Sequence, residues 1–242
     1  MTPHLAIVTG GTRGIGYAIA HAILAAGGRV MITGRDQRGV DAAVRTLQTS
    51  AAGGDATRVF GAAVDVRDKN AVVQLVALAA MKLGGVNVLV NNAGVGVFTD
   101  VASTTDEEWA SVIDTNLTGV FYCTRAAIPE LRKARGSWII NIASLAGRNY
   151  FPNGAAYCAS KAGLIAFSES LMQEVRYDDI RVSVVMPGSV ATEFNHPMPG
   201  GRDDDWKLTG DDVAEVVIDL LRHPGRSLPS RVEIRPSKPK KG

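Results

Sequence analysis

The sequence is poor in cysteine and contains no long apolar run. Cys123 and Cys158 are the two cysteines among 242 residues, too few for a disulfide framework, and their spacing is not that of metal ligands. No apolar stretch approaches the roughly 18 residues of a membrane span, and an apolar segment that begins at Leu5 leaves no room for a signal peptide. We therefore expect a protein of the reducing cytoplasm with no metal site and no membrane segment.

An excess of charge of one sign is also absent. Lysine and arginine number 26 and aspartate and glutamate 24, which gives a formal net charge of +2. This balance gives no reason to expect a nucleic-acid partner. The last residues, 236–242, are locally basic, and we expect them to form a solvated, disordered tail rather than a nucleic-acid contact.

What the sequence does contain is an alternation of short apolar, β-branched segments with longer segments of helical periodicity. This alternation predicts right-handed crossovers and a parallel sheet. We expect one α/β domain, residues 1–235, of the Rossmann type: a doubly wound parallel sheet of about seven strands with helices on both faces. The expected strands are 5–9, 29–33, 58–63, 86–90, 137–142, 181–186 and 231–234, and the expected helices 41–47, 71–83, 109–131, 155–177 and 211–222. Residues 193–209 show neither pattern and are expected to form a substrate lid loop.

A glycine-rich loop follows the first expected strand and precedes a helical pattern. Free backbone N–H groups and the helix dipole at such a junction favour a phosphate group. The spacing is Gly-x3-Gly-x-Gly rather than the common dinucleotide fingerprint, so a plain glycine-rich turn remains the alternative. The candidate phosphate-binding residues are Gly10, Thr12, Arg13, Gly14, Ile15 and Gly16.

Tyr157 and Lys161 are separated by one helical turn, and Ser144 lies upstream of them. On a helix the phenol and the ammonium emerge from the same face. A nearby cation favours the phenolate, so we expect Lys161 to lower the pKa of Tyr157 towards neutrality. A serine hydroxyl can hold the oxygen that the tyrosine protonates. This arrangement suits carbonyl reduction or alcohol oxidation.

Further candidate residues, several of them polar or glycine, follow the ends of the expected strands. In doubly wound sheets, ligands bind beyond the carboxyl ends of the strands, so these residues are expected to meet at one edge. They are Arg35, Asp65, Val66, Asn92, Ala93, Gly94, Ser144, Pro187 and Gly188.

Together these residues resemble the short-chain dehydrogenase/reductase family, and the chain most resembles bacterial 3-oxoacyl-[acyl-carrier-protein] reductases. The resemblance runs from Thr9 to about Asp219 and includes Asn116 and Thr192. It implies that Tyr157 is the general acid, that Ser144 positions the substrate oxygen, and that Lys161 binds the nicotinamide ribose. It further implies cofactor contacts by Gly10, Thr12, Arg13, Gly14, Ile15, Gly16, Arg35, Asp65, Val66, Asn92, Ala93, Gly94, Tyr157, Lys161, Pro187, Gly188, Val190 and Thr192.

The resemblance also gives Asn116 a role. It implies that Asn116, on the expected helix 109–131, holds a water that links Lys161 to solvent. The alternative is a helix-interior amide that is satisfied locally by backbone groups.

The cofactor preference is inferred from the end of the second expected strand. An acidic residue there would bind the ribose 2′-hydroxyl of NAD, but this chain has Gly34 followed by Arg35. Arg35, with Arg13, offers donors suited to a 2′-phosphate, so we expect NADP(H). The alternative is that Arg35 is a solvated turn residue.

We therefore expect an NADP(H)-dependent reductase of a ketone or 3-oxoacyl carbonyl. Its partners would be a small-molecule substrate, or a carrier-protein thioester bound through Arg132, Lys133 and Arg135. The family implies a homotetramer or homodimer. Alternatives are an NADP-dependent alcohol or hydroxysteroid-type dehydrogenase and, from a different class, a catalytically silent dinucleotide-sensing regulator.

Overall fold

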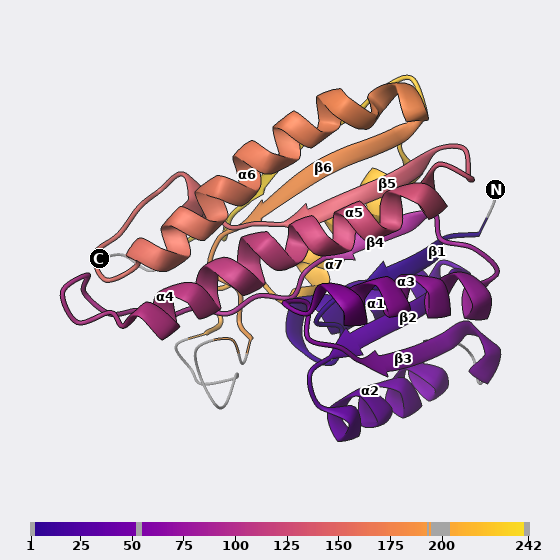
Figure 1. Cartoon of the computed structure of the whole chain (residues 1–242), viewed down its shortest axis with the longest axis horizontal. Coiled ribbons are helices and arrows are strands. Elements are labelled where there is room, and N and C mark those ends of the chain that lie inside the picture. The colour runs from indigo at the N-terminus through magenta and orange to yellow at the C-terminus, as the bar shows by residue number, and fades with distance from the viewer. Residues whose placement is uncertain (1–2, 52–54, 193, 195–203, 240–242) are drawn as a thin grey trace.

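The computed structural model describes residues 3–51, 55–192, 194 and 204–239. Within them, seven parallel strands form one sheet in the order β3-β2-β1-β4-β5-β6-β7 (Figure 1). The strands are β1 Leu5–Val8, β2 Arg29–Gly34, β3 Val59–Ala63, β4 Val88–Asn91, β5 Ser137–Ile142, β6 Ile180–Pro187 and β7 Arg231–Ile234. The strand order reverses beside β1, as in doubly wound sheets. The predicted Rossmann-type fold class is confirmed.

Helices cover both faces of the sheet, as Figure 1 shows. One face carries α1 Gly14–Ala25, α2 Gln37–Ser50 and α7 Gly210–Arg222. The other carries α3 Lys69–Leu83, α5 Gly119–Leu131 and α6 Ala155–Val175. Helix α4 Asp106–Ile113 packs against α6. Every residue of β5 is buried, because a central strand of such a sheet meets a helical layer on each side.

The expected helix over 109–131 is interrupted. Residues Asp114–Thr118 form a π-helical turn between α4 and α5. The buried amide of Asn116, inside this turn, bonds to both backbone groups of Val95 on the loop after β4. A widened turn lets this side chain reach a neighbouring segment, and such turns often occur at functional sites.

Helix α6 also ends earlier than the periodicity predicts. It stops at Val175, and a 3-10 turn over Arg176–Asp178 follows. Asp179 then has a φ of 60°, in the left-handed region, which reverses the chain direction and starts β6.

Several expectations fall wholly or partly outside the described residues. Of the expected lid loop 193–209, the structure describes Phe194 and 204–209, where Leu208 pairs with Val190. The structure does not describe residues 52–54, 193, 195–203 and 240–242. The expected tail 236–242 is therefore placed only as far as residue 239. Its disorder stays a prediction, as does the assignment of 1–235 to one domain.

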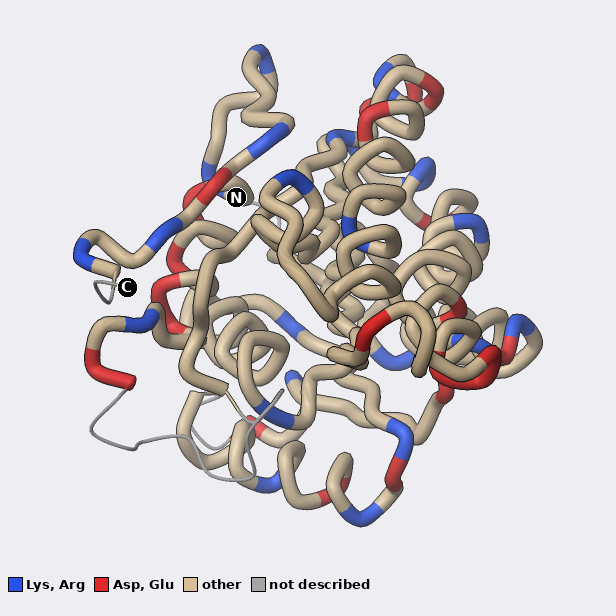
Figure 2. Tube along the Cα trace, turned by 90° about the vertical axis from the view of Figure 1, so that its left-hand side faces the viewer, with Lys and Arg blue, Asp and Glu red and all other residues tan. Residues whose placement is uncertain are grey.

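Charged residues of both signs are spread over the described part of the chain. In Figure 2 the positions of lysine and arginine and those of aspartate and glutamate are both scattered along the trace. No described helix is both long enough and apolar enough to span a bilayer. The same residues contain no group of three or more histidine, cysteine or acidic side chains that could hold a metal ion.

Candidate active site

A cavity of about 1080 Å³ opens at the carboxyl edge of the sheet, where the sequence predicts ligand binding. Ser144 lines it, and so do all but two of the other predicted site residues. These are Gly10, Thr12, Arg13, Gly14, Ile15, Arg35, Asp65, Val66, Asn92, Ala93, Gly94, Tyr157, Lys161, Pro187, Gly188, Val190 and Thr192. Gly16 and Asn116 do not line the cavity. Each contacts a residue that does, since Gly16 lies against Asn92 and Asn116 is bonded to Val95.

Three glycines shape the loop after β1. Gly10 and Gly14 have φ angles of 63° and 56°, which residues with side chains rarely adopt. A Cβ on Gly16 would lie 2.3 Å from Nδ2 of Asn92 and 2.4 Å from the carbonyl oxygen of Gly10. Gly16 therefore lets α1 start against the end of β4. No side chain caps the start of α1. The first backbone N–H groups of the helix can therefore donate hydrogen bonds to an anion in the cavity.

Thr9 joins the glycine loop to the loop after β4, a role that the sequence analysis missed. Its hydroxyl oxygen accepts hydrogen bonds from the backbone N–H groups of Asn92 at 3.0 Å and Ala93 at 3.1 Å. In return, Nδ2 of Asn92 donates to the carbonyls of Thr9 and Gly10, both at 3.0 Å. A polar residue that ends a buried strand is the signal that could have revealed this role.

The end of the cavity beyond β2 and β3 is polar and open. Arg35 and Arg13 are exposed there. The Asp65 carboxylate accepts two bonds from Nε of Arg67 at 3.0 Å and one from Nη2 at 2.6 Å. This pairing with Arg67 is the main cause of the lowered pKa of Asp65, and the charge of Arg35 lowers it further. A Cβ on Gly34 would lie 2.6 Å from Cγ2 of Thr12, so the glycine also has a packing reason.

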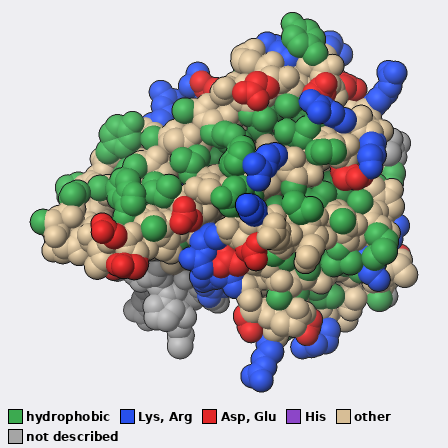
Figure 3. Space-filling view, in the orientation of Figure 1, with side chains coloured by type: hydrophobic (Ala, Val, Ile, Leu, Met, Phe, Trp, Pro, Cys, Tyr) green, Lys and Arg blue, Asp and Glu red, His purple; other side chains and the backbone are tan. Residues whose placement is uncertain are grey.

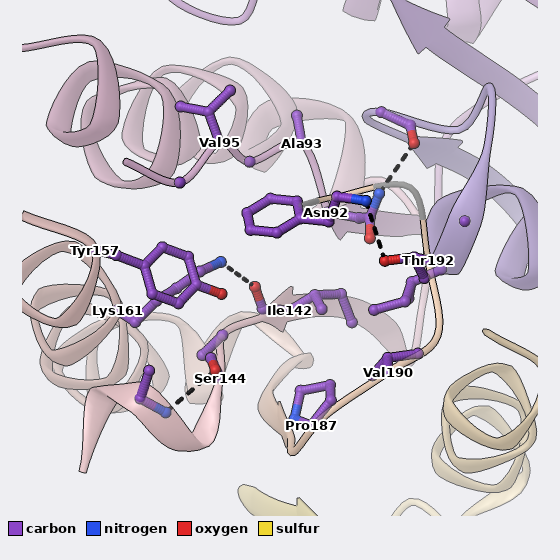
Figure 4. A pocket seen from close by; sticks show the side chains of 18 of the residues that line it. Asn92, Ala93, Val95, Ile142, Ser144, Tyr157, Lys161, Pro187, Val190 and Thr192 are labelled. Carbon is purple, nitrogen blue, oxygen red and sulfur yellow. Dashed lines mark hydrogen bonds between the residues drawn. The ribbon is translucent and has the colours of Figure 1, made fainter. Parts of the chain in front are cut away.

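At the opposite end, Tyr157 and Lys161 extend from α6 into the cavity beside Ser144 (Figure 4). Lys161 is 5% exposed, and its Nζ donates to the carbonyl oxygen of Ile142 at 2.9 Å. Burial lowers the pKa of Lys161 from 10.5 to about 8, because desolvation disfavours the charged form. The Ser144 oxygen accepts from the N–H of Ala146 at 3.1 Å and begins the 3-10 turn Leu145–Gly147.

The pKa of Tyr157 differs from the sequence-based expectation. It is raised rather than lowered, because burial disfavours the phenolate, and a hydrogen bond with Ser144 offsets this only in part. Nζ of Lys161 lies 5.8 Å from the centre of the Tyr157 ring and is directed at the Ile142 carbonyl. The phenol is therefore protonated at neutral pH.

Asn116 supports this end of the cavity from the π-helical turn. It is fully buried, and its amide bonds to N and O of Val95, both at 2.8 Å, and to Oγ of Ser160 at 3.0 Å. Its amide is therefore satisfied by backbone, as in the alternative above, but by a segment distant in sequence. A Cβ on Gly94 would lie 3.2 Å from Oδ1 of Asn116 and 3.7 Å from Nζ of Lys161. The missing side chain leaves room between these two groups. The water-holding role stays a prediction.

The amino-acid sequence is similar to those of known oxidoreductases. A family model described as short chain dehydrogenase matches residues 4–202. The 3-oxoacyl-[acyl-carrier-protein] reductase FabG of Haemophilus influenzae is 38% identical over 194 residues, which are 80% of this chain and 77% of that protein. An uncharacterized oxidoreductase of Staphylococcus saprophyticus is 32% identical over 236 residues, 96% of this chain and 97% of its own.

Solved structures share the same arrangement. An alcohol dehydrogenase from the archaeon Thermococcus sibiricus, complexed with 5-hydroxy-NADP, superposes with a TM-score of 0.87 at 27% identity, covering 98% of both chains. A metagenomic short-chain oxidoreductase in complex with NADP gives a TM-score of 0.83 at 34% identity, covering 98% of this chain and 99% of that one.

Proposed function

Because the chain belongs to the short-chain dehydrogenase family, we propose that it is an NADP(H)-dependent oxidoreductase that reduces a ketone to a secondary alcohol. The observation that carries this proposal is the pairing of two hydroxyl groups at one end of the cavity. The hydroxyl groups of Ser144 and Tyr157 lie at this end beside the buried ammonium of Lys161 (Figure 4). Two converging donors suit a carbonyl oxygen that gains negative charge as it is reduced.

The cavity residues fit a nicotinamide dinucleotide. The uncapped start of α1 and the positive φ angles of Gly10 and Gly14 suit the pyrophosphate. Val66 and Asn92 line the same cavity. When bound, the reduced cofactor supplies the hydride that the carbonyl carbon receives.

The chain's own residues would orient the substrate and move one proton. The Ser144 and Tyr157 hydroxyls hold the carbonyl oxygen, and the proton passes from the Tyr157 oxygen to it as the alcohol forms. The raised pKa of Tyr157 keeps this proton in place at neutral pH. The ammonium of Lys161 stabilises the phenolate left behind, because the two side chains lie one turn apart on α6.

NADP(H) is preferred over NAD(H) in this proposal. Arg13 and Arg35 are exposed at the open end of the cavity and suit the 2′-phosphate as donors of charge-assisted hydrogen bonds. No carboxylate stands at Gly34 to bind a free 2′-hydroxyl. The two solved relatives named above carry NADP or a derivative of it.

A small-molecule ketone fits better than a carrier-protein thioester. Of the three basic residues expected to bind a carrier, two are already paired within the chain. Nη2 of Arg132 lies 2.7 Å from the Asp178 carboxylate, and Nζ of Lys133 lies 2.6 Å from that of Glu130. Paired cations attract an acidic partner less strongly.

A homotetramer built through α4, α5 and α6 and a cytoplasmic location belong to the proposal as well. Hydrophobic side chains gather over these helices in Figure 3. Trp109 on α4 and Phe121 on α5 are 46% and 40% exposed, and a second copy of the chain would cover them. Light scattering at micromolar concentration tests the assembly, and a monomer would contradict it.

A substrate screen tests the proposed function. Purified protein is mixed with NADPH or NADH and a panel of aryl ketones, cyclic ketones and an acetoacetyl thioester, and the loss of reduced-nicotinamide absorbance is followed. We expect reduction of at least one ketone with NADPH. Cofactor binding without turnover across the whole panel would instead favour the dinucleotide-sensing regulator, and turnover limited to alcohols and NADP would favour the dehydrogenase.

A further inference from the structure

Three phenylalanine rings line the cavity around Tyr157, and the proposed reaction does not use them. Phe98, Phe151 and Phe194 come from three separate loops, and their side chains are 39%, 42% and 41% exposed. Apolar and aromatic side chains commonly line ligand pockets, and covering them with an apolar ligand group is favourable by the hydrophobic effect. Their position beside the proton donor indicates that the substrate covers them.

The rings form a continuous row with Tyr157. Phe98 and Phe151 are stacked with centroids 5.9 Å apart and planes inclined by 26°. Phe98 and Phe194 are tilted against Tyr157, at centroid distances of 5.5 and 5.8 Å. These distances lie within the range in which aromatic rings attract one another by stacking or edge-to-face contact. A further ring can therefore join the row with the same geometry.

Two glycines make room for the rings. A Cβ on Gly96 would lie 2.8 Å from Cε2 of Phe98 and 3.0 Å from Cε1 of Phe194. A Cβ on Gly154 would lie 2.5 Å from Cε2 of Phe151. Any side chain at these positions would displace the rings, so the row depends on both glycines as well as on the phenylalanines.

Two cationic side chains that line the same cavity, Arg235 and Lys207, are each paired with an acidic residue of the described chain. Arg235 is bonded to Glu233 at 2.7 Å, and Lys207 is paired with Asp204. The ammonium of Lys161 is directed at the Ile142 carbonyl. The surroundings of the row therefore favour an uncharged apolar substituent over an anionic one.

We propose that the substrate is a ketone whose carbonyl carries an aryl or other planar conjugated ring, which stacks on the row formed by Phe98, Phe151 and Phe194. This inference rests on the proposed function, because it takes the Tyr157 hydroxyl as the group that the carbonyl oxygen reaches. Phe98 is the central specificity-determining residue, since it contacts both Phe151 and Tyr157.

The test compares phenyl methyl ketone with cyclohexyl methyl ketone, which have the same carbon skeleton. The cyclohexyl group is at least as apolar, so a preference for phenyl reports ring stacking rather than hydrophobicity alone. The ratio of the two kcat/KM values is measured with NADPH in the wild type and in Phe98→Leu, and the ratio between the proteins removes the intrinsic reactivity of each ketone. We expect Phe98→Leu to lower the preference for phenyl by roughly two- to tenfold.

The control is Tyr177→Leu, because Tyr177 is 95% exposed and belongs to the turn after α6. It should leave the ratio unchanged. A second measurement needs no variant: benzamide should inhibit the wild-type reaction at least twofold more tightly than cyclohexanecarboxamide. Reduction of both ketones with an equal ratio in wild type and Phe98→Leu, or equal inhibition by the two amides, overturns the aryl inference and leaves the reductase standing. Absence of reduction with every ketone overturns the proposed function itself.

Discussion

The two ends of the cavity hold their cations in opposite environments. Arg35, at the open end, is exposed to solvent, whereas Lys161, at the Tyr157 end, is 5% exposed and has a pKa lowered to about 8. An exposed cation acts on a charged ligand through interactions that salt screens. A buried cation destabilises the folded chain, and the size of this destabilisation depends on pH because the group can lose its proton. The open end therefore suits selection of a cofactor. The Tyr157 end, which is the closed end because its cation is buried, suits chemistry.

The largest effect should come from the closed end. Tyr157→Phe removes the proton donor and keeps the ring in the aromatic row, so we expect turnover to fall by more than roughly 100-fold. Affinity for NADPH, measured by nicotinamide fluorescence, should stay within about twofold, because the exposed contacts at the open end remain. Tyr177→Phe, on the exposed tyrosine, is the control and should retain full activity. A Tyr157→Phe variant with more than a tenth of the parent rate would remove this hydroxyl from the reaction.

Lys161→Met tests the cost of the buried ammonium. Because the pKa of Lys161 is lowered from 10.5 to about 8, the unfolded chain binds more protons than the folded one between these pH values. Lys161 should therefore contribute a rise in the free energy of unfolding with pH across this window, by on the order of 3 kcal/mol at most. The buried Cys123 thiol, whose pKa is raised from 9.0 to about 12, contributes a fall in the upper part of the window in both proteins. Denaturant unfolding at a series of pH values should therefore show a more positive slope of the free energy of unfolding with pH in the wild type than in Lys161→Met.

The slope with pH is the decisive quantity in that experiment. Loss of the bond to the Ile142 carbonyl changes stability at every pH and does not alter the slope. Turnover should also fall in Lys161→Met, because the phenolate loses its neighbouring cation. An identical slope in both proteins would mean that the ammonium is not desolvated in solution.

Arg35→Ala tests the open end and should have a smaller effect. One charge-assisted hydrogen bond to a 2′-phosphate is worth about 1.5–3 kcal/mol, so the preference for NADPH over NADH should fall by about tenfold or more. The control is Arg45→Ala, which removes an exposed arginine on α2. Gly34→Asp is a poorer test, because its Cβ would crowd Thr12. An unchanged preference in Arg35→Ala would make Arg35 a solvated turn residue.

Salt should separate the two ends with the smallest effect. Raising the ionic strength shortens the range over which exposed charges act. The NADPH preference over NADH should therefore fall severalfold, while kcat at saturating cofactor and ketone should stay nearly constant. A kcat that falls in parallel with the preference would show that the closed end is as open to ions as Arg35.

The sequence by itself determined the features that depend on neighbouring residues. The alternation of strand and helix patterns predicted the doubly wound sheet, and β5 and β7 have the expected bounds. The four-residue spacing placed Tyr157 and Lys161 on one face of α6, because a helical turn is a local property. The glycine loop was predicted for the same reason, since a strand, a turn and a helix start follow one another directly.

Only the tertiary structure decided what depends on burial and on contacts between distant segments. The π-helical turn at Asn116 is associated with bonds to Val95 and Ser160, which lie 21 and 44 residues away. The raised pKa of Tyr157 follows from desolvation, and spacing along a helix carries no information on how deeply that helix is covered. The row of Phe98, Phe151 and Phe194 joins three loops at one sheet edge, and no local pattern reports such a meeting. Hydrophobic periodicity fixes which elements form, whereas the packing of those elements fixes the chemistry of the groups between them.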